Sequence, residues 1–231
     1  MSEPRYAIYF APAPHTQLWS LGSRWLGRDA KTGETLARPE PIQPDNGGQL
    51  TSSPRRYGFH ATLKPPMRLR TGTTIGQLCV KLAAWAQRQS PFSVRLKCAA
   101  LGKFIALVPE TTSDSTRMSL LAADCVEILD EFRQPPTHDE LARRRSAGLS
   151  HRQDEMLVRY GYPYVLSEFR FHMTLSNAIA DEVLRTQFWN KASLWFAEVL
   201  SEPVLVNQVA IYKENESGGN FSWFKTFALG R

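Results

Sequence analysis

The sequence of 231 residues contains the same four-residue pattern twice. His-x-Thr-Leu occurs at His60–Leu63 and again at His172–Leu175, each time within an apolar stretch. The same shift along the chain, without gaps, also aligns identical residues elsewhere: Phe59 with Phe171, Pro91 with Pro203, and Val94 with Val206. We interpret this as an internal duplication. Two lobes of one architecture, related by a pseudo-twofold axis, would bring the two repeated strands face to face.

Apolar periodicity and breaker residues predict an α+β protein with short strands. Strands are expected over Arg5–Ala11, Tyr57–Leu63 with a stop at Pro65 and Pro66, Phe92–Ala99, Lys103–Pro109, Phe169–Leu175, Pro203–Lys213 and Phe221–Leu229. Helices are expected around Leu18–Gly27, over Thr74–Arg88 and Ser115–Phe132, from the capping residue Thr137, and over Ser150–Tyr160 and Asp181–Leu200.

The whole chain, residues 1–231, is expected to form a single bilobal domain. The repeats cover about 57–109 and 169–229, and about 114–160 form a helical insertion. Residues 28–56 are predicted to be a long loop, because prolines and glycines are frequent there and apolar residues are few. A lid or rim of the site is one role for such a loop.

The net charge of +6 and the pI of about 9.4 suggest an anionic partner. The excess of Lys and Arg lies in residues 1–110, so the first half should attract the anion. Charge alone does not decide between a small phosphate ligand and a nucleic acid. The three cysteines have no metal or redox spacing, and no apolar run approaches the roughly 20 residues of a membrane helix. We expect reduced thiols and a cytoplasmic protein without membrane contact and without a signal peptide.

Strand side chains alternate between faces, so the histidine and threonine of each motif should share one face. His60, Thr62, His172 and Thr174 would then line one cleft. A neutral imidazole can take a proton from an attacking water while a protonated imidazole donates one to the leaving oxygen. The hydroxyls would hold phosphoryl oxygens. Because no Asp, Glu or Cys shares these strands, we expect neither a metal nor a cofactor.

Further residues are candidates for substrate binding. Strand parity places Lys64 beside the first motif and Arg170 beside the second, and Tyr57 precedes the first motif. Tyr164 could stack on a base or sugar ring, although loop aromatics that cover a core are commoner. His138 and His151 lie in charge-rich helical sequence and are interpreted as solvated. The run Arg143–Arg145 could bind a phosphate backbone, but the acidic residues nearby in sequence favour a solvated helix face. A purely structural role of the repeated motif is the competing interpretation.

At its two H-x-T motifs the sequence resembles the 2H phosphoesterase superfamily. A closer resemblance, to the 2H-type proteins encoded in bacterial phosphonate-utilisation gene clusters, rests on RYAIYFAP at Arg5, YGFHATLKPP at Tyr57, LGKFIALVP at Leu101, GLSHRQ at Gly148, and YGYPYV at Tyr160 leading to FRFHMTL. The resemblance implies a LigT-like fold with a central cleft between two lobes of antiparallel sheet with outer helices. It also implies that His60 and His172 are catalytic and that Thr62 and Thr174 are their hydroxyl partners.

The resemblance further implies a metal-independent cyclic phosphodiesterase. Its substrate would be a small ribose cyclic phosphate, namely 5-phosphoribosyl 1,2-cyclic phosphate in phosphonate catabolism, and the basic first half would suit the additional 5-phosphate. Two alternatives remain open at this point. One is an RNA end-processing enzyme acting on 2′,3′-cyclic phosphates, and the other is a non-catalytic protein that binds a phosphorylated metabolite.

Overall fold

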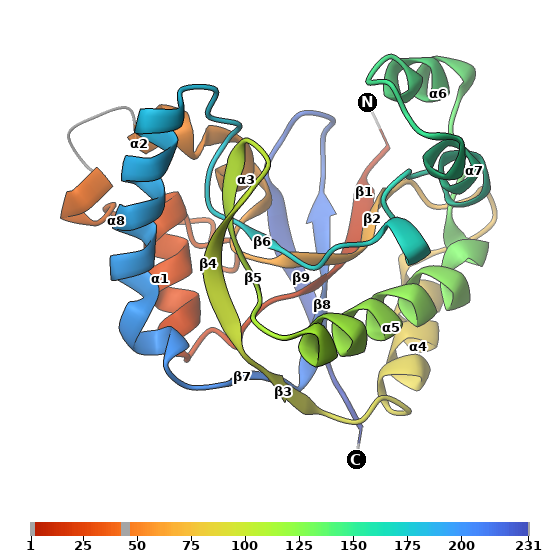
Figure 1. The fold of residues 1–231 in the computed structure, drawn as a ribbon. Helices are drawn as coiled ribbons and strands as arrows, with labels where there is room; N and C mark the ends of the chain where they lie inside the picture. The colour runs from red at the N-terminus through yellow and green to blue at the C-terminus, as the bar shows by residue number, and fades with distance from the viewer. Residues whose placement is uncertain (1–2, 43–46, 231) are drawn as a thin grey trace.

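The computed structural model describes residues 3–42 and 47–230, and its strands form a seven-stranded sheet and a two-stranded ribbon (Figure 1). All strand pairs are antiparallel. The sheet has the order β4-β5-β6-β2-β1-β8-β9, with β1 at Arg5–Phe10, β2 at Ala61–Met67, β4 at Leu96–Leu101, β5 at Phe104–Pro109, β6 at Met173–Thr174, β8 at Gln208–Glu214 and β9 at Phe221–Ala228. The ribbon joins β3 (Phe92–Val94) and β7 (Val204–Val206).

Helices cover the sheet on two sides (Figure 1). Helices α1 (Gln17–Leu26) and α8 (Glu182–Leu200) pack together next to β4 and β5, whereas α4 (Ile75–Ala86) and α5 (Thr112–Ile128) pack on β9 and β2. The shorter helices are η1 (Glu40–Ile42), α2 (Gly47–Leu50), α3 (Ser52–Tyr57), η2 (Asp130–Phe132), α6 (His138–Arg145), α7 (His151–Tyr160) and η3 (Leu166–Glu168). Helices α6 and α7 lie at one edge of the molecule, near the start of β1. The expected α+β class with antiparallel sheet and outer helices is confirmed.

The predicted twofold relation is visible in the strand pairing. Ala61 of β2 pairs with Met173 of β6, and Ser93 of β3 pairs with Leu205 of β7. Each pair joins two positions that are equivalent in the repeats, so a pseudo-twofold axis passes between their members. The β4–β5 hairpin of the first repeat lies beside β6 of the second, and β8 of the second repeat joins β1, which pairs with β2. Each lobe of the sheet therefore contains strands from both repeats.

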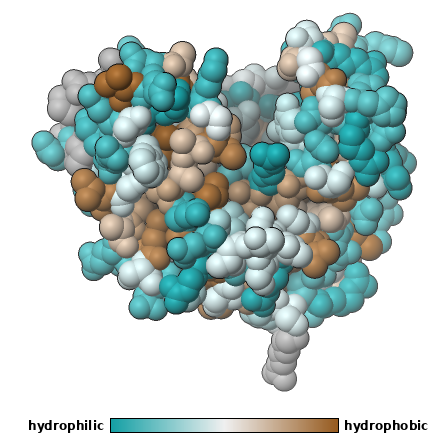
Figure 2. Space-filling view, in the orientation of Figure 1, coloured by the Kyte–Doolittle hydropathy of each residue, from teal (hydrophilic) through white to brown (hydrophobic). Residues whose placement is uncertain are grey.

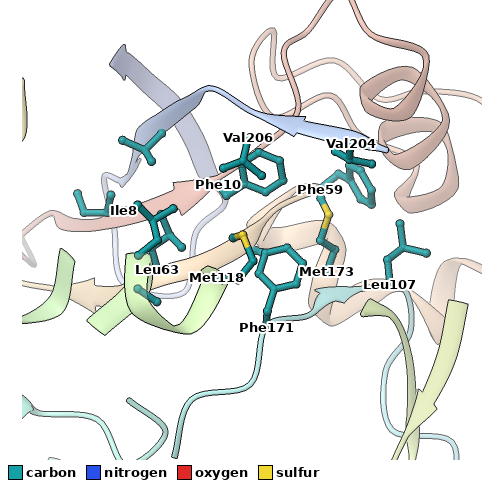
Figure 3. Packing of buried hydrophobic residues seen from close by; sticks show 14 of the residues in the cluster. Ile8, Phe10, Phe59, Leu63, Leu107, Met118, Phe171, Met173, Val204 and Val206 are labelled. Carbon is teal, nitrogen blue, oxygen red and sulfur yellow. The ribbon is translucent and has the colours of Figure 1, made fainter. Parts of the chain in front are cut away.

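One apolar cluster joins both repeats beneath the sheet (Figure 3). It contains the equivalent residues Phe59 and Phe171, together with Met173 and Val206. The Phe59 ring is stacked against Phe196 of α8, with ring centroids 6.1 Å apart. Because Phe59 directly precedes His60, this packing gives the first motif a rigid base. No helix within residues 3–42 and 47–230 has the length and apolarity that a membrane span requires.

Residues 28–56 are less irregular than the proline content predicts. The segment contains η1, α2 and the start of α3, whereas residues 43–46, which also fell in the predicted loop, lie outside the described residues. Pro54 is compatible with α3 because it lies in the first turn, where a backbone N–H has no partner inside the helix. The prediction of a long loop was therefore wrong at α3. Helix signals this short are hard to separate from loop sequence.

The strand predictions were also wrong at both motifs. Strand β2 continues through Pro65 and Pro66, because β6 pairs with it only at Ala61 and its pairing with β1 shifts register nearby. The second motif strand is only β6, two residues long rather than the seven of Phe169–Leu175. Two further long strands are split at the equivalent positions Arg95 and Asn207, where the chain leaves the ribbon for the sheet.

Substitution of Gly22 in α1 tests this packing, because helix propensity and packing change the free energy of unfolding in opposite directions. Gly22→Ala should favour the helix by about 1 kcal/mol on propensity alone. However, the added Cβ would lie 2.2 Å from Cδ1 of Phe59, and overpacking costs about 1–3 kcal/mol. We expect the free energy of unfolding, measured by urea titration, to fall by up to about 2 kcal/mol.

Gly76→Ala in α4 is the matched control. Its Cβ would make only an ordinary contact, 3.7 Å from Oγ1 of Thr74, so this variant should be neutral or more stable by up to about 1 kcal/mol. Stabilisation by Gly22→Ala would contradict the close packing of α1 on Phe59.

Candidate active site

Both motif histidines are held in the same way. Nδ1 of His60 lies 2.8 Å from the carbonyl oxygen of Gly58, and Nδ1 of His172 lies 2.7 Å from the carbonyl oxygen of Arg170. Gly58 and Arg170 are themselves equivalent positions of the repeat. Because a carbonyl oxygen only accepts hydrogen bonds, each Nδ1 must carry the proton. The neutral tautomer therefore leaves Nε2 of each ring with its lone pair, ready to take a proton.

His60 lies in an aromatic environment. The ring of Tyr9 is stacked on it, with centroids 3.7 Å apart and planes 23° from parallel. Nε2 lies 3.3 Å from Oγ1 of Thr62, which can donate to the neutral ring. Tyr57 lies 6.2 Å from the imidazole and is stacked on Phe221. The predicted candidates Thr62 and Tyr57 are thus both neighbours of His60.

His172 lies at the wall of a cavity of about 640 Å³. Figure 2 shows the surface hollowed at the top of the view, between the part that carries α6 and α7 and the part that carries α8. The cavity is bounded by β2, the tip of the β4–β5 hairpin, α7 and the segment that leads to β6, through residues that include Thr62, Phe104, Gln153, Tyr162, Tyr164, Glu168, Arg170 and His172.

Four of the eight predicted site residues therefore meet at this cavity: Thr62, Tyr164, Arg170 and His172. His60 is not among the residues that line the cavity, but its Nε2 contacts the hydroxyl of Thr62, which is one of them. Thr174 pairs with Ala106 in β6 and does not line the cavity. The carboxylate of Glu168 and the amide of Gln153 are polar groups of the wall that the motif analysis did not single out.

Burial governs the electrostatics of both imidazoles. Desolvation lowers the pKa of His60 from 6.5 to about 4, against the opposing hydrogen bond to Gly58, and the charge of His172 lowers it further. The pKa of His172 is also lowered by desolvation, while its hydrogen bond to Arg170 opposes the shift. Because the charge of one imidazole affects the other, the two motifs share one electrostatic environment. At neutral pH, His60 is unprotonated.

The structure corrects the expectation that Lys64 binds substrate. Between Thr62 and Lys64 the pairing of β2 with β1 shifts by one residue, which breaks the alternation of faces. The ammonium group is therefore buried under α5, where it donates to the carbonyl oxygen of Val126 and to Oδ1 of Asp130, each at 3.0 Å. Lys64 is a structural residue that cannot reach the cavity without leaving its counterion.

Sequence reasoning missed three residues around the histidines. Tyr9 lies on the face of β1 opposite Tyr6, Ile8 and Phe10, so the apolar alternation of this strand could have indicated it. Phe104 lies 5.7 Å from His172. Arg28 is buried and donates to the carbonyl oxygens of Arg55, Arg56 and Phe221, which ties the end of α3 to β9 just before Gly58. No motif signals these long-range contacts.

Among the described residues, no three His, Cys, Asp or Glu side chains are grouped so that they could hold a metal ion.

Residues 62–222 match the family model described as "Protein of unknown function (DUF1045)". The match covers more than half of the chain. The chain belongs to the DUF1045 family.

Two relatives of this DUF1045 chain carry the name "Ribose 1,5-bisphosphate phosphokinase PhnN". The relative from Janthinobacterium sp. (strain Marseille) is 36% identical over 95% of this chain and 49% of its own length. The relative from Laribacter hongkongensis (strain HLHK9) is 35% identical over 94% of this chain and 50% of its own length. The chain thus spans about half the length of the curated relatives that it matches.

Solved structures similar to this DUF1045 chain include E. coli LigT in its apo form, at 15% identity with full coverage of both chains and a TM-score of 0.41. The phosphate complex of LigT, at 14% identity and the same coverage, has a TM-score of 0.44. Protein ATU0111 from Agrobacterium tumefaciens is 13% identical over 97% of this chain and 85% of its own, with a TM-score of 0.47. These likenesses concern the fold.

The buried ion pair below the site makes a prediction about stability. Asp130→Ala would leave the ammonium group of Lys64 buried without its counterion, so the free energy of unfolding should fall by about 3 kcal/mol in urea titration. Lys64→Met should cost clearly less, because Asp130 keeps its ion pair with Arg133. Equal effects of the two substitutions would show that Lys64 does not depend on Asp130.

A second prediction concerns pH. The folded-state pKa of His60 lies below the unfolded value, so the unfolded chain binds the additional proton between pH 6.5 and 4. This contribution to stability is complete above pH 6.5 and decreases as pH falls, by at most about 1.4 kcal/mol per pH unit. His60→Gln should reduce the slope of unfolding free energy against pH in this window.

Histidine NMR titration measures the same property directly. The ring signals of His60 should stay those of the neutral form at pH 5.5. A midpoint for His60 above pH 6 would contradict the burial argument.

Proposed function

We propose that this DUF1045 chain is a phosphodiester hydrolase of the 2H type, in which His60 and His172 act as general base and general acid without a metal. The observation that carries the proposal is the matched pair of imidazoles, each with Nδ1 held by the carbonyl oxygen two residues earlier. This arrangement leaves both Nε2 atoms for proton transfer. General acid–base catalysis requires groups whose proton can be taken up and released at the reacting atoms.

The low pKa favours His60 as the base. In the proposed reaction, Nε2 of His60 takes a proton from water as the water oxygen bonds to phosphorus. Nε2–H of protonated His172 gives its proton to the leaving sugar oxygen as the phosphorus–oxygen bond breaks. The bound phosphate anion favours the protonated form of His172. The hydroxyl of Thr62 and the guanidinium of Arg170, which line the cavity, would stabilise the charge on the nonbridging oxygens.

The proposed substrate is 5-phosphoribosyl 1,2-cyclic phosphate. The cavity has room for a sugar phosphate, and Tyr164 and Phe104 provide apolar walls. Hydrolysis of the bond between phosphorus and O2 would leave the phosphate on C1, and the product would be ribose 1,5-bisphosphate. This compound appears in the name of the two curated relatives. The agreement supports the choice of the O2 bond.

The kinase name of those relatives applies to proteins of twice this length. This chain contains no G-x-x-x-x-G-K-[ST] segment, the phosphate-binding loop of many nucleotide-dependent kinases. We therefore propose hydrolysis, not phosphoryl transfer from a nucleotide, for the part of those relatives that this chain matches.

The test is phosphorus NMR of the EDTA-treated protein with 5-phosphoribosyl 1,2-cyclic phosphate. The wild type should open the ring, and His60→Ala and His172→Ala should each lower kcat by about 10²–10⁴-fold. His151→Ala is the matched control, because this exposed histidine pairs with Glu155 on α7 and is no part of the proposed site. Its kcat should be unchanged.

Two outcomes would overturn parts of the proposal. Undiminished turnover in either single variant of the site would exclude the two-histidine mechanism. Opening of a nucleoside 2′,3′-cyclic phosphate instead of the ribosyl compound would move the protein to RNA end processing. Ligand-induced thermal stabilisation without any turnover would identify a binding protein.

A further inference from the structure

The cavity that His172 lines is called the histidine cavity below. A second, smaller cavity lies beside it and is lined by five arginines. It has a volume of about 60 Å³ and lies where β2 ends, next to the connection from η2 to α6 and to Gly161. We call this cavity the arginine basin; its cations are Arg5, Arg68, Arg133, Arg143 and Arg144. They come from four separate parts of the chain, so the fold, and no local charge run, brings them together.

The carboxylates nearby do not neutralise the arginine basin. Glu140 pairs with Arg68 at 2.7 Å, Glu214 is shared by Arg5 and Arg56, and Asp130 is shared by Arg133 and Lys64. The lining residues and their direct ion-pair partners thus hold five cations and three carboxylates, and Glu214 and Asp130 each pair with one further cation, Arg56 and Lys64. Within the described residues, Arg143 and Arg144 take part in no ion pair, and Arg144 lies over the ring of Tyr162 at 4.7 Å.

The size and chemistry of the arginine basin suit one phosphate group. Its volume of about 60 Å³, against about 640 Å³ for the histidine cavity, leaves room for a small group such as a tetrahedral oxyanion. One guanidinium group can donate two parallel hydrogen bonds to two oxygens of the same phosphate group. The guanidinium of Arg133 is nearly fully buried and is packed against Gly161, where an added Cβ would lie 3.0 Å from Nη1.

The arginine basin and the histidine cavity have a common wall. Pro65 and Tyr162 line the histidine cavity, whereas the adjacent residues Pro66 and Gly161 line the basin. Arg5 lies on the same face of β1 as Tyr9, the ring stacked on His60, about 13 Å away along the strand at roughly 3.3 Å per residue. The guanidinium of Arg5 lies over the ring of Phe221, 5.6 Å from its centroid, and this ring is stacked on Tyr57 beside His60.

We propose that the arginine basin binds a phosphomonoester group at the far end of the ligand whose phosphodiester lies at the histidines. The inference rests on the proposed function and extends it by a recognition site for a second phosphate. Arg143 and Arg144 are the residues that this group engages, since the other three arginines already have carboxylate partners.

Calorimetry with ribose 5-phosphate as the probe tests the basin without any turnover. The wild type should bind ribose 5-phosphate and not ribose. Arg143→Gln combined with Arg144→Gln should weaken the binding about 10- to 100-fold, because charge-assisted hydrogen bonds are lost. The matched control combines Arg145→Gln with Arg152→Gln, which removes the same charge from exposed positions of α6 and α7 outside the basin. Its affinity should stay within about twofold.

Equal losses of affinity for ribose 5-phosphate in the two double variants would show nonspecific attraction and overturn the specific site. An absence of binding by the wild type would also overturn the arginine basin as a phosphate site.

A turnover experiment separates this result from the proposed function. The Arg143/Arg144 double variant should raise KM for 5-phosphoribosyl 1,2-cyclic phosphate and leave the hydrolysis of ribose 1,2-cyclic phosphate unchanged. Normal KM for the phosphorylated substrate would overturn the basin and keep the two-histidine mechanism, whereas a wild type without turnover would overturn the mechanism and leave the calorimetry to decide on the basin.

Discussion

The arrangement of the site depends on one backbone contact, the antiparallel pair of Ala61 and Met173 across the pseudo-twofold axis. These residues occupy the central position of the two H-x-T motifs. When they pair, the histidines on either side of them are brought into one environment. Because β6 is so short, the contact is supported by its neighbours: β5 pairs with β6, and Phe59 and Phe171 share one core. The sheet and the site are consequences of the same duplication.

Desolvation gives the paired imidazoles their chemical character. The stacked ring of Tyr9 removes water from one face of His60, and the carbonyl of Gly58 fixes which nitrogen carries the proton. A carbonyl partner orients the ring without placing a negative charge beside it, so the neutral form is kept. A carboxylate partner would favour the protonated form more strongly. Tyr9 is stacked on His60, whereas Phe104 lies 5.7 Å from His172, so the two equivalent positions have different surroundings and different proposed tasks. The arginines of the arginine basin are proposed to attract the anion from outside the histidine cavity.

Much of the fold could be predicted from the sequence, because period, caps and the exact repeat are local signals. The capping residues Thr74, Thr137, Ser150 and Asp181 start their helices as expected. Lys64 could not be placed, because a one-residue register shift between β2 and β1 reverses its face and only the pairing reveals such a shift. The arginine basin was missed for a related reason: it is assembled from distant segments, and Glu140, an acidic neighbour of Arg143 and Arg144 that also lines the basin, is paired with Arg68.

The central claim, that the paired histidines direct water to phosphorus and release the sugar oxygen O2, is tested most directly by hydrolysis in H₂¹⁸O. Phosphorus NMR of the product from 5-phosphoribosyl 1,2-cyclic phosphate should show one ¹⁸O atom in the phosphate on C1 and none in the 5-phosphate. Label in a phosphate on C2, an unlabelled phosphate group that indicates carbon–oxygen cleavage, or an intact cyclic substrate would each contradict the account.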